Sequence, residues 1–302
     1  MARDPSTSST LRLSELGEFG LLADLERRGL AHGIGDDAAV FQDGLVVTQD
    51  VLLEGVHFRL DWTSWRDLGY KAAAVNLSDL AAMGAAPAGL LVALVAPPET
   101  EERAIVALYE GIAETGVPVV GGDTAAGERL LVGVTAIGHA ERVPGRAGAV
   151  PGDVLVVTGE LGGSAAGLYV LENGLAGHEA LAERHRRPPF RLDASQALAP
   201  VAHAMIDLSD GIASDARRIA DRSGCKLVVD VGALPLADGV SDLADEPFWT
   251  MGEDYELLAA LAPYDVDRLG FPVVGRCEQG SGVELRRGGE VIEAEGWEHF
   301  RP

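Results

Sequence analysis

The sequence contains two successive stretches with a pattern of helices and strands. The loop between these stretches limits the folds that the chain can adopt. Up to about residue 140, apolar residues at helical spacing are interspersed with short strand-like runs. A loop with Pro151-Gly152 follows at 145–153, and the pattern then begins again with a strand and a glycine turn. We therefore expect a mixed α/β (α+β) protein with two domains, over residues 1–145 and 146–302.

The expected elements have recognisable ends. Gly29 and Gly84 follow two apolar helical stretches, and three glutamates stand in the first turn of the helix after Pro98. Helices are predicted over 13–28, 65–83, the stretch between Pro98 and Gly116, from 164 and over 212–222. Strands are predicted over 38–41, 45–48, 51–58, 89–95, 117–120, 130–136, 154–158, 204–208 and 226–231, with a hairpin at 283–294.

The charge of the chain excludes one class of partner. Its 302 residues include 24 Lys and Arg against 47 Asp and Glu, which gives a formal net charge of −23. A surface of that sign repels the phosphate backbone, so nucleic acid is not an expected partner. The longest apolar run is far shorter than the ~20 residues that cross a bilayer, and no membrane partner is expected either.

The two cysteines and the N-terminus bear on the compartment. Cys225 and Cys277 are too few for a disulfide framework, and neither stands in a metal-binding pair. The first ten residues are polar and lack the apolar core of a signal peptide. We therefore expect a cytoplasmic protein with two reduced, buried thiols.

Aspartates recur beside glycines and at the predicted ends of strands. Taken singly, each has an ordinary explanation, because Asp beside Gly makes turns and Asp before a helix caps it. Taken together they suggest a ligand site, since glycines let a ligand approach the backbone. The residues are Asp36, Asp50, Asp79, Asp123, Asp207 and Asp210.

Asp79 is the sharpest of these cases. It lies on a predicted helix among Leu77, Leu80 and Met83, where a charge is costly to bury unless it is paired or bound to a metal. Clustered carboxylates also repel one another, so a cation must hold them together. Oxygen ligands without Cys or several His favour Mg²⁺, which shares its other positions with water and phosphates.

Familiar nucleotide-binding motifs are absent. Neither Lys71 nor Lys226 stands in a P-loop, and the motif set of a protein kinase is missing. The segment 159–164 leads into a predicted helix and could present backbone N–H groups to a phosphate. An ordinary turn and helix cap is an equal alternative for that segment.

Taken in order, seven motifs resemble those of the thiamine-phosphate kinase family over nearly the whole chain. They are GIGDDAA at 33–39, TQD at 48–50, EGVHF at 54–58, KAAAVNLSDLAAMGA at 71–85, GGDT at 121–124, IDLSDG at 206–211 and GEDYEL at 252–257. The family belongs to the aminoimidazole ribonucleotide synthetase-like superfamily. The resemblance implies transfer of the ATP γ-phosphoryl group to thiamine phosphate, with several Mg²⁺ ions. It also implies a homodimer whose N-terminal halves form a shared β-barrel.

The resemblance also implies the site residues by motif match. Around Mg²⁺ it places Asp36, Thr48, Gln49, Asp50, Asp79, Asp123, Asp207 and Asp210. At ATP it places Tyr109, Gly122, Asp123, Arg146 and Ser209, with Asp123 and Arg146 stabilising charge in the reaction. Around thiamine phosphate it places His57, Glu253 and Trp297. No general base is expected.

Two residues depart from the family pattern. Gln49 replaces a hydroxyl residue, so we expect only its backbone carbonyl to serve a metal, and Met251 replaces a glycine before Gly252. Two alternatives stay open: another ATP-using member of the superfamily, or a non-catalytic nucleotide- or thiamine-binding module. Selenophosphate synthetase would need an N-terminal Cys, and the hydrogenase-maturation relative a C-terminal one, neither of which this sequence has.

Overall fold

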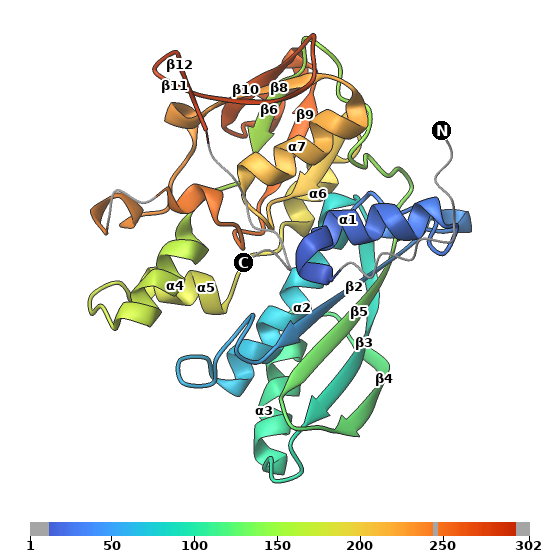
Figure 1. Ribbon diagram of the computed structural model, residues 1–302, viewed down its shortest axis with the longest axis vertical. Helices are drawn as coiled ribbons and strands as arrows, with labels where there is room; N and C mark the ends of the chain where they lie inside the picture. Colours follow the sequence, from blue (N-terminus) through green and yellow to red (C-terminus); the bar gives the residue numbers. More distant parts are fainter. Residues whose placement is uncertain (1–11, 244–246, 294–302) are drawn as a thin grey trace. The chain divides into compact units, whose positions relative to one another are not determined.

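The computed structural model describes residues 12–243 and 247–293 (Figure 1). It divides into two compact units, one of residues 1–35 with 297–302 and one of residues 36–296. The first contains helix α1 (Leu13–Arg27), which ends before Gly29 as predicted and is interrupted at Gly17, where φ is 66°. All other elements belong to the second unit.

A five-stranded sheet forms the first half of the second unit, in the order β1-β2-β5-β3-β4. β3 and β4 run parallel, and the other neighbouring strands are antiparallel. The strands are β1 (Ala39–Val40), β2 (Leu45–Leu53), β3 (Ala86–Ala96), β4 (Val119–Ala126) and β5 (Leu131–His139). Figure 1 shows helices α2 (Trp65–Ala82) and α3 (Glu102–Ala113) on one side of this sheet.

Two strands run further than the sequence predicts. The ladder between β2 and β5 continues without a break from Leu45 to Leu53, so Asp50 lies inside a strand and does not end one. β4 likewise passes through Asp123, because Gly122 lets it approach β3 closely. A Cβ atom at Gly122 would lie 1.9 Å from the carbonyl oxygen of Val92. Pairing with a neighbouring strand thus overrides the local preference of Gly and Asp for turns.

The second half of the unit is built on a seven-stranded sheet, in the order β12-β11-β8-β10-β6-β9-β7. Its strands are β6 (Val154–Val157), β7 (Ala204–Asp207), β8 (Lys226–Asp230), β9 (Leu257–Leu261), β10 (Val273–Glu278), β11 (Gly282–Arg287) and β12 (Glu290–Ile292). The helices are α4 (Gly163–Asn173), α5 (Glu179–Arg186), α6 (Leu192–Leu198), α7 (Ile212–Ser223) and α8 (Pro263–Leu269). The predicted hairpin is confirmed as β11 and β12.

Helix α2 packs against both sheets. Leu77 and Leu80 are fully buried in the core under the five-stranded sheet. One turn on, Ala81 and Ala82 join a second core with Met205 and other residues of the seven-stranded sheet. Small residues let these surfaces meet, since few side-chain atoms separate helix from strand. The residues of α2 are therefore fixed relative to both sheets.

In the described residues the five-stranded sheet is open, and β4 is one of its edges. All eight residues of β4 are exposed. The mixed α/β class is confirmed, whereas the barrel shared across a dimer stays a prediction. No helix in the described part of the chain is long and apolar enough to span a membrane.

Candidate active site

Three carboxylates from separate parts of the chain meet at one point. Asp37 lies in the turn before β1, Asp79 near the end of α2, and Asp207 at the end of β7. One oxygen of each lies within 4.8 Å of the others. Asp79 and Asp207 are among the residues predicted around Mg²⁺, whereas the predicted ligand before β1 is Asp36, the neighbour of Asp37; these roles stay predictions. Oxygens at this spacing suit a hard divalent cation.

The electrostatics of this cluster show an excess of negative charge. Burial is the main cause that raises the pKa of Asp37, Asp79 and Asp207. Neighbouring carboxylates raise the pKa of each of them further. Without a cation the buried anions are therefore disfavoured, and a bound cation would reverse that effect.

Hydrogen bonds hold the three carboxylates but leave part of them unsatisfied. Thr48 donates from Oγ1 to Oδ2 of Asp79 over 2.5 Å, and Ser78 donates from Oγ to Oδ2 of Asp207 over 2.7 Å. Arg146 donates from Nη2 to Oδ1 of Asp37 over 2.5 Å. Oδ2 of Asp37 and Nε of Arg146 are buried and have no partner among the described residues. An orphaned acceptor and donor side by side fit a site for a cation and an anionic ligand.

Asp50 and Thr48 approach the cluster from β2. The backbone N–H of Asp50 donates to Oδ1 of Asn76 on α2 over 2.9 Å. Burial, followed by Asp210 and Asp37, raises the pKa of Asp50 to about 6. Gln49 is exposed between them, and successive side chains of a strand point to opposite faces. The prediction that only the backbone of Gln49 could serve a metal is consistent with that position.

Asp210 lies just before α7 and contacts two charged residues of that helix, Asp215 and Arg218. Its carboxylate accepts a hydrogen bond from Arg218, and its backbone N–H donates to Asp215 over 3.1 Å. Burial, followed by Asp210, raises the pKa of Asp215 to about 8. Arg218 therefore already offsets part of the charge of Asp210, as Arg146 does for Asp37. Among the described residues, Asp79 and Asp207 are bonded to no arginine.

Two predicted ligands lie apart from the three-carboxylate cluster. Asp36 accepts the backbone N–H of Arg146 at Oδ1 over 2.8 Å, so it fixes the chain that presents this arginine. Asp123 is exposed on β4, and its Oδ1 accepts the N–H of Thr124 over 2.9 Å. Neither is a member of the described cluster, and their roles at a metal stay predictions.

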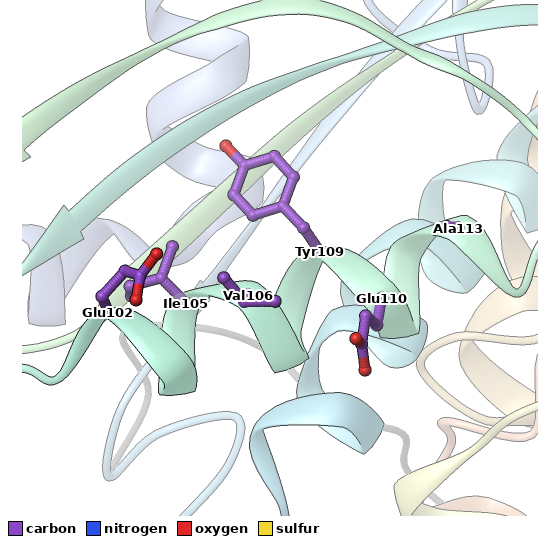
Figure 2. A pocket seen from close by; sticks show the side chains of 6 residues that line it. All are labelled: Glu102, Ile105, Val106, Tyr109, Glu110 and Ala113. Atoms are coloured by element: carbon purple, nitrogen blue, oxygen red, sulfur yellow. The ribbon is translucent and has the colours of Figure 1, made fainter.

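Tyr109 lies in a different place, on α3, where it is partly buried against the core of the five-stranded sheet. Figure 2 shows its ring projecting from the helix beside Ile105 and Val106. These side chains, with Glu102, Glu110 and Ala113, line an open hollow of about 410 Å³. An aromatic and aliphatic lining suits a flat ring, as expected for the base of a nucleotide.

The loop before β9 presents Glu253. Its backbone N–H donates to the carbonyl of Ser209 over 2.8 Å, and its carboxylate pairs with Lys71 over 3.0 Å. Met251 is exposed, with an ordinary φ of −91°, so this position does not require the family's glycine. His57 lies on another loop, where Nδ1 accepts the N–H of Leu53 over 3.0 Å. Trp297 lies outside the described residues.

The glycine turn at 159–164 holds a carboxylate of the protein itself. The N–H groups of Gly162 and Ser164 donate to the two oxygens of Asp254, over 2.7 and 3.4 Å. Of the two alternatives left open, the turn and helix cap is thus the one found. Burial raises the pKa of Asp254 to about 7.

Comparisons with known proteins define the family. The models of the N-terminal and C-terminal domains of AIR synthase related protein match residues 35–140 and 150–270. Thiamine-monophosphate kinase of Aquifex aeolicus is 35% identical over 312 residues, covering 96% of this chain and 100% of the relative. Its counterpart from Mycobacterium tuberculosis is 38% identical over 313 residues, covering 95% and 93%. The chain belongs to the thiamine-monophosphate kinase family.

The structure agrees with that membership. A solved structure described as AaThiL complexed with AMPPCP and TMP has a TM-score of 0.89 to this chain. It is 35% identical and covers 97% of this chain and 100% of its own. The two-domain AIR synthase-like fold predicted from the motifs is thereby confirmed. In this chain Asp37, Asp79 and Asp207 come together only through tertiary packing.

Proposed function

We propose that this protein transfers the γ-phosphoryl group of ATP to thiamine phosphate, giving thiamine diphosphate and ADP. Similarity over 97% of the chain, at 35% identity, to the structure described as AaThiL complexed with AMPPCP and TMP is the observation on which this proposal depends most. The charge-unbalanced carboxylates add a reason from this chain alone, since they suit the magnesium ions that assist phosphoryl transfer. The oxygen of thiamine phosphate would bond to the γ-phosphorus while the bond from that phosphorus to the β-bridging oxygen breaks.

The acceptor removes the need for a general base. Its phosphate monoester has a second pKa of ~6, so its oxygens are largely ionised at neutral pH. The remaining task is to bring two anions together in line, and positioning and positive charge perform it. Arg146, anchored through Asp36 and Asp37, is the arginine that we assign to this neutralisation. Asp123 stays a predicted contributor on β4.

The residues present fit Mg²⁺. We infer that Asp37, Asp79 and Asp207 hold one ion, with Asp50, Thr48 and Asp210 as neighbouring ligands for others. We prefer Asp37 to Asp36, because Asp37 lies within reach of Asp79 and Asp207 and its Oδ2 has no partner among the described residues. When bound, Mg²⁺ would neutralise phosphate charge and orient the phosphoryl group. Tyr109, Gly122 and Ser209 would contact the nucleotide, and His57, Glu253 and Trp297 thiamine phosphate.

A single assay tests the proposed activity. Purified protein is mixed with Mg²⁺, ATP and thiamine phosphate, and thiamine diphosphate is separated and quantified with ADP. We expect the two products in equal amounts, no product with excess chelator, and recovery with Mg²⁺ but not with Zn²⁺. ADP release that is independent of thiamine phosphate would contradict the acceptor, and binding of both substrates without product would favour the non-catalytic module.

We further propose that the working form is a cytoplasmic homodimer. The exposed β4 is a free sheet edge, with Val119 and Val120 exposed on it, and such edges are usually paired or covered. A second copy that covers this edge would extend the sheet, as in the predicted barrel. Sedimentation equilibrium should give twice the chain mass of 31.6 kDa, and a monomer at assay concentrations would overturn the proposal. Cys225 and Cys277 are free and buried, in keeping with a reducing compartment.

A further inference from the structure

Lys71 is a lysine buried almost completely inside the protein. Its side chain is 1% exposed on α2, and Nζ lies 3.0 Å from Oε2 of Glu253. Burying an ammonium group is costly unless an anion pairs with it. None of the seven motifs explains why a helix rich in alanine has a lysine at this position. The partner is a residue that we assign to thiamine phosphate, so the pair is a candidate for a functional role.

Glu253 is held in an unusual backbone conformation. Its φ is 58°, and Gly252 before it and Tyr255 after it also have positive φ. A left-handed conformation costs a residue with a side chain ~1 kcal/mol or more. The bond from its N–H to the carbonyl of Ser209 and the ion pair with Lys71 offset that strain. The side chain is therefore placed by contacts to two different parts of the fold.

His185 on α5 gives the same carboxylate a second partner. Its Nδ1 lies 3.2 Å from Oε2 of Glu253 and 3.2 Å from Oγ of Ser164. Burial and then Lys71 lower the pKa of His185, so the ring is neutral at neutral pH. A carboxylate only accepts, so Nδ1 must carry the proton of the ring. Both contacts use one nitrogen, which excludes the Ser-His-Glu relay of a hydrolase, because that relay needs both nitrogens.

Both partners bind the same oxygen of Glu253. In the described part of the chain Oε1 accepts no hydrogen bond, and the side chain is 28% exposed. Burial acts to raise the pKa of Glu253, but Lys71 and His185 outweigh it and lower the pKa below its usual value. The result is an ionised carboxylate with one oxygen fixed by the protein and the other available to a ligand.

We propose that Lys71 and His185 are positioning residues that set Glu253 to receive the ring system of thiamine phosphate, in which the thiazolium ring is cationic and the aminopyrimidine ring bears N–H groups. This proposal depends on the proposed function, in which Glu253 contacts that substrate. Thiamine phosphate combines an anionic phosphate with a positively charged ring system, and an acidic site needs a separate element to select each end. Mg²⁺ and Arg146 suit the phosphate, and the Lys71–Glu253–His185 group suits the rings.

Kinetics of three variants test the proposal. Lys71→Met, Glu253→Gln and the double variant are assayed with each substrate varied in turn. We expect Lys71→Met to raise KM for thiamine phosphate by about tenfold, which corresponds to loss of a charge-assisted hydrogen bond. KM for ATP should change less than about twofold. Because Lys71 acts through Glu253, the double variant should equal Glu253→Gln instead of multiplying the two effects.

Matched variants cover failures of folding. Lys226→Met removes the only other lysine, which pairs with Glu278 and Glu284, and it should leave both KM values unchanged. If Lys71→Met does not fold, His185 provides the test: Leu removes the donor, while Asn keeps an N–H close to the place of Nδ1. His185→Leu should then raise KM for thiamine phosphate, and His185→Asn should restore most of the affinity.

The outcomes separate this proposal from the proposed function. Wild-type protein that makes no thiamine diphosphate would overturn both. Active wild-type protein whose Lys71 or His185 variants keep the KM for thiamine phosphate would overturn the positioning role alone. Equal rises in both KM values, or effects that multiply in the double variant, would also overturn it, because they would indicate a general structural role.

Discussion

Buried carboxylates occur in two regions of this molecule, and the two regions differ in how far the protein offsets their negative charge. Glu256 is fully buried, and its oxygens accept hydrogen bonds from both Arg191 and Thr158. The cluster of Asp37, Asp79 and Asp207 is also buried, but only Asp37 of the three is bonded to an arginine, Arg146. Burial alone therefore does not indicate that an acid belongs to a ligand site. Negative charge that the protein's own cations do not offset does indicate it.

The largest difference between the two regions should come from Asp79→Asn. Loss of one metal ligand should lower kcat/KM by about 10³, since the ion contributes several kcal/mol and each 1.36 kcal/mol is tenfold. The same change removes repulsion in the metal-free protein, so its melting temperature in chelator should rise or stay constant. Product assays and thermal melts measure the two effects. Turnover near wild type with saturating Mg²⁺ would remove Asp79 from the site.

Variants of the adjacent residues Asp36 and Asp37 test which of the two belongs to the cluster. Asp37→Asn should lower kcat/KM by about 10² because its carboxylate faces Asp79 and Asp207. Asp36→Asn should lower it by less than about tenfold, because Asp36 contacts the backbone of Arg146. Steady-state kinetics at several Mg²⁺ concentrations compare them. The reverse order of effects would place Asp36 at the metal and Asp37 in support.

Glu256→Gln should give the opposite phenotype. Removing this charge leaves Arg191 with a weaker partner, and because Arg191 is 33% exposed, water limits the loss to about 2 kcal/mol of unfolding free energy. Urea unfolding measures that loss. The kcat of the folded fraction should stay within about twofold of wild type, and a large fall in kcat at unchanged stability would refute the contrast.

The smallest effect concerns pH. The pKa values of Asp254 and Asp215 are raised to about 7 and about 8, whereas both groups titrate near 3.9 when unfolded. Between pH 7 and 8.5 the folded protein therefore binds more protons than the unfolded chain, and stability should fall by about 1–2 kcal/mol as pH rises. Asp79 and Asp207 add to this fall only without metal. Mg²⁺ should lessen the slope in thermal melts, and a rise of stability with pH in chelator would contradict it.

Much of the fold follows from local patterns in the sequence. The helix predicted over 65–83 is α2, whose start is capped by Ser64 and whose end is marked by Gly84. Short elements such as α6 and β10 were not predicted, since a few residues set little periodicity. The positions of Asp50 and Asp123 inside strands depend on pairing with β5 and β3, which no local pattern contains.

The types of residue at the candidate site could be predicted from the sequence better than their arrangement in space. Asp79 could be identified because a charge on an apolar helix needs a partner. The motif match favoured Asp36, whereas Asp37 is the one that lies with Asp79 and Asp207. No local pattern separates the two, since adjacent residues share one motif and differ only in the direction of their side chains. Apart from its presence in a motif, nothing in the sequence indicated a role for Lys71, because its partner Glu253 lies 182 positions away along the chain.

Helix α2 also fixes the distance between Lys71 and Asp79. Lys71 at one point pairs with Glu253, and Asp79 just over two turns later lies in the cluster with Asp37 and Asp207. Those positions are ~12 Å apart along the helix axis. One inserted residue between them would turn everything beyond it by about 100° and shift it ~1.5 Å, so one of the two ends would lose its partners. Over the course of evolution, insertions and deletions should therefore collect in the surface loops of this protein and leave residues 71–79 without gaps.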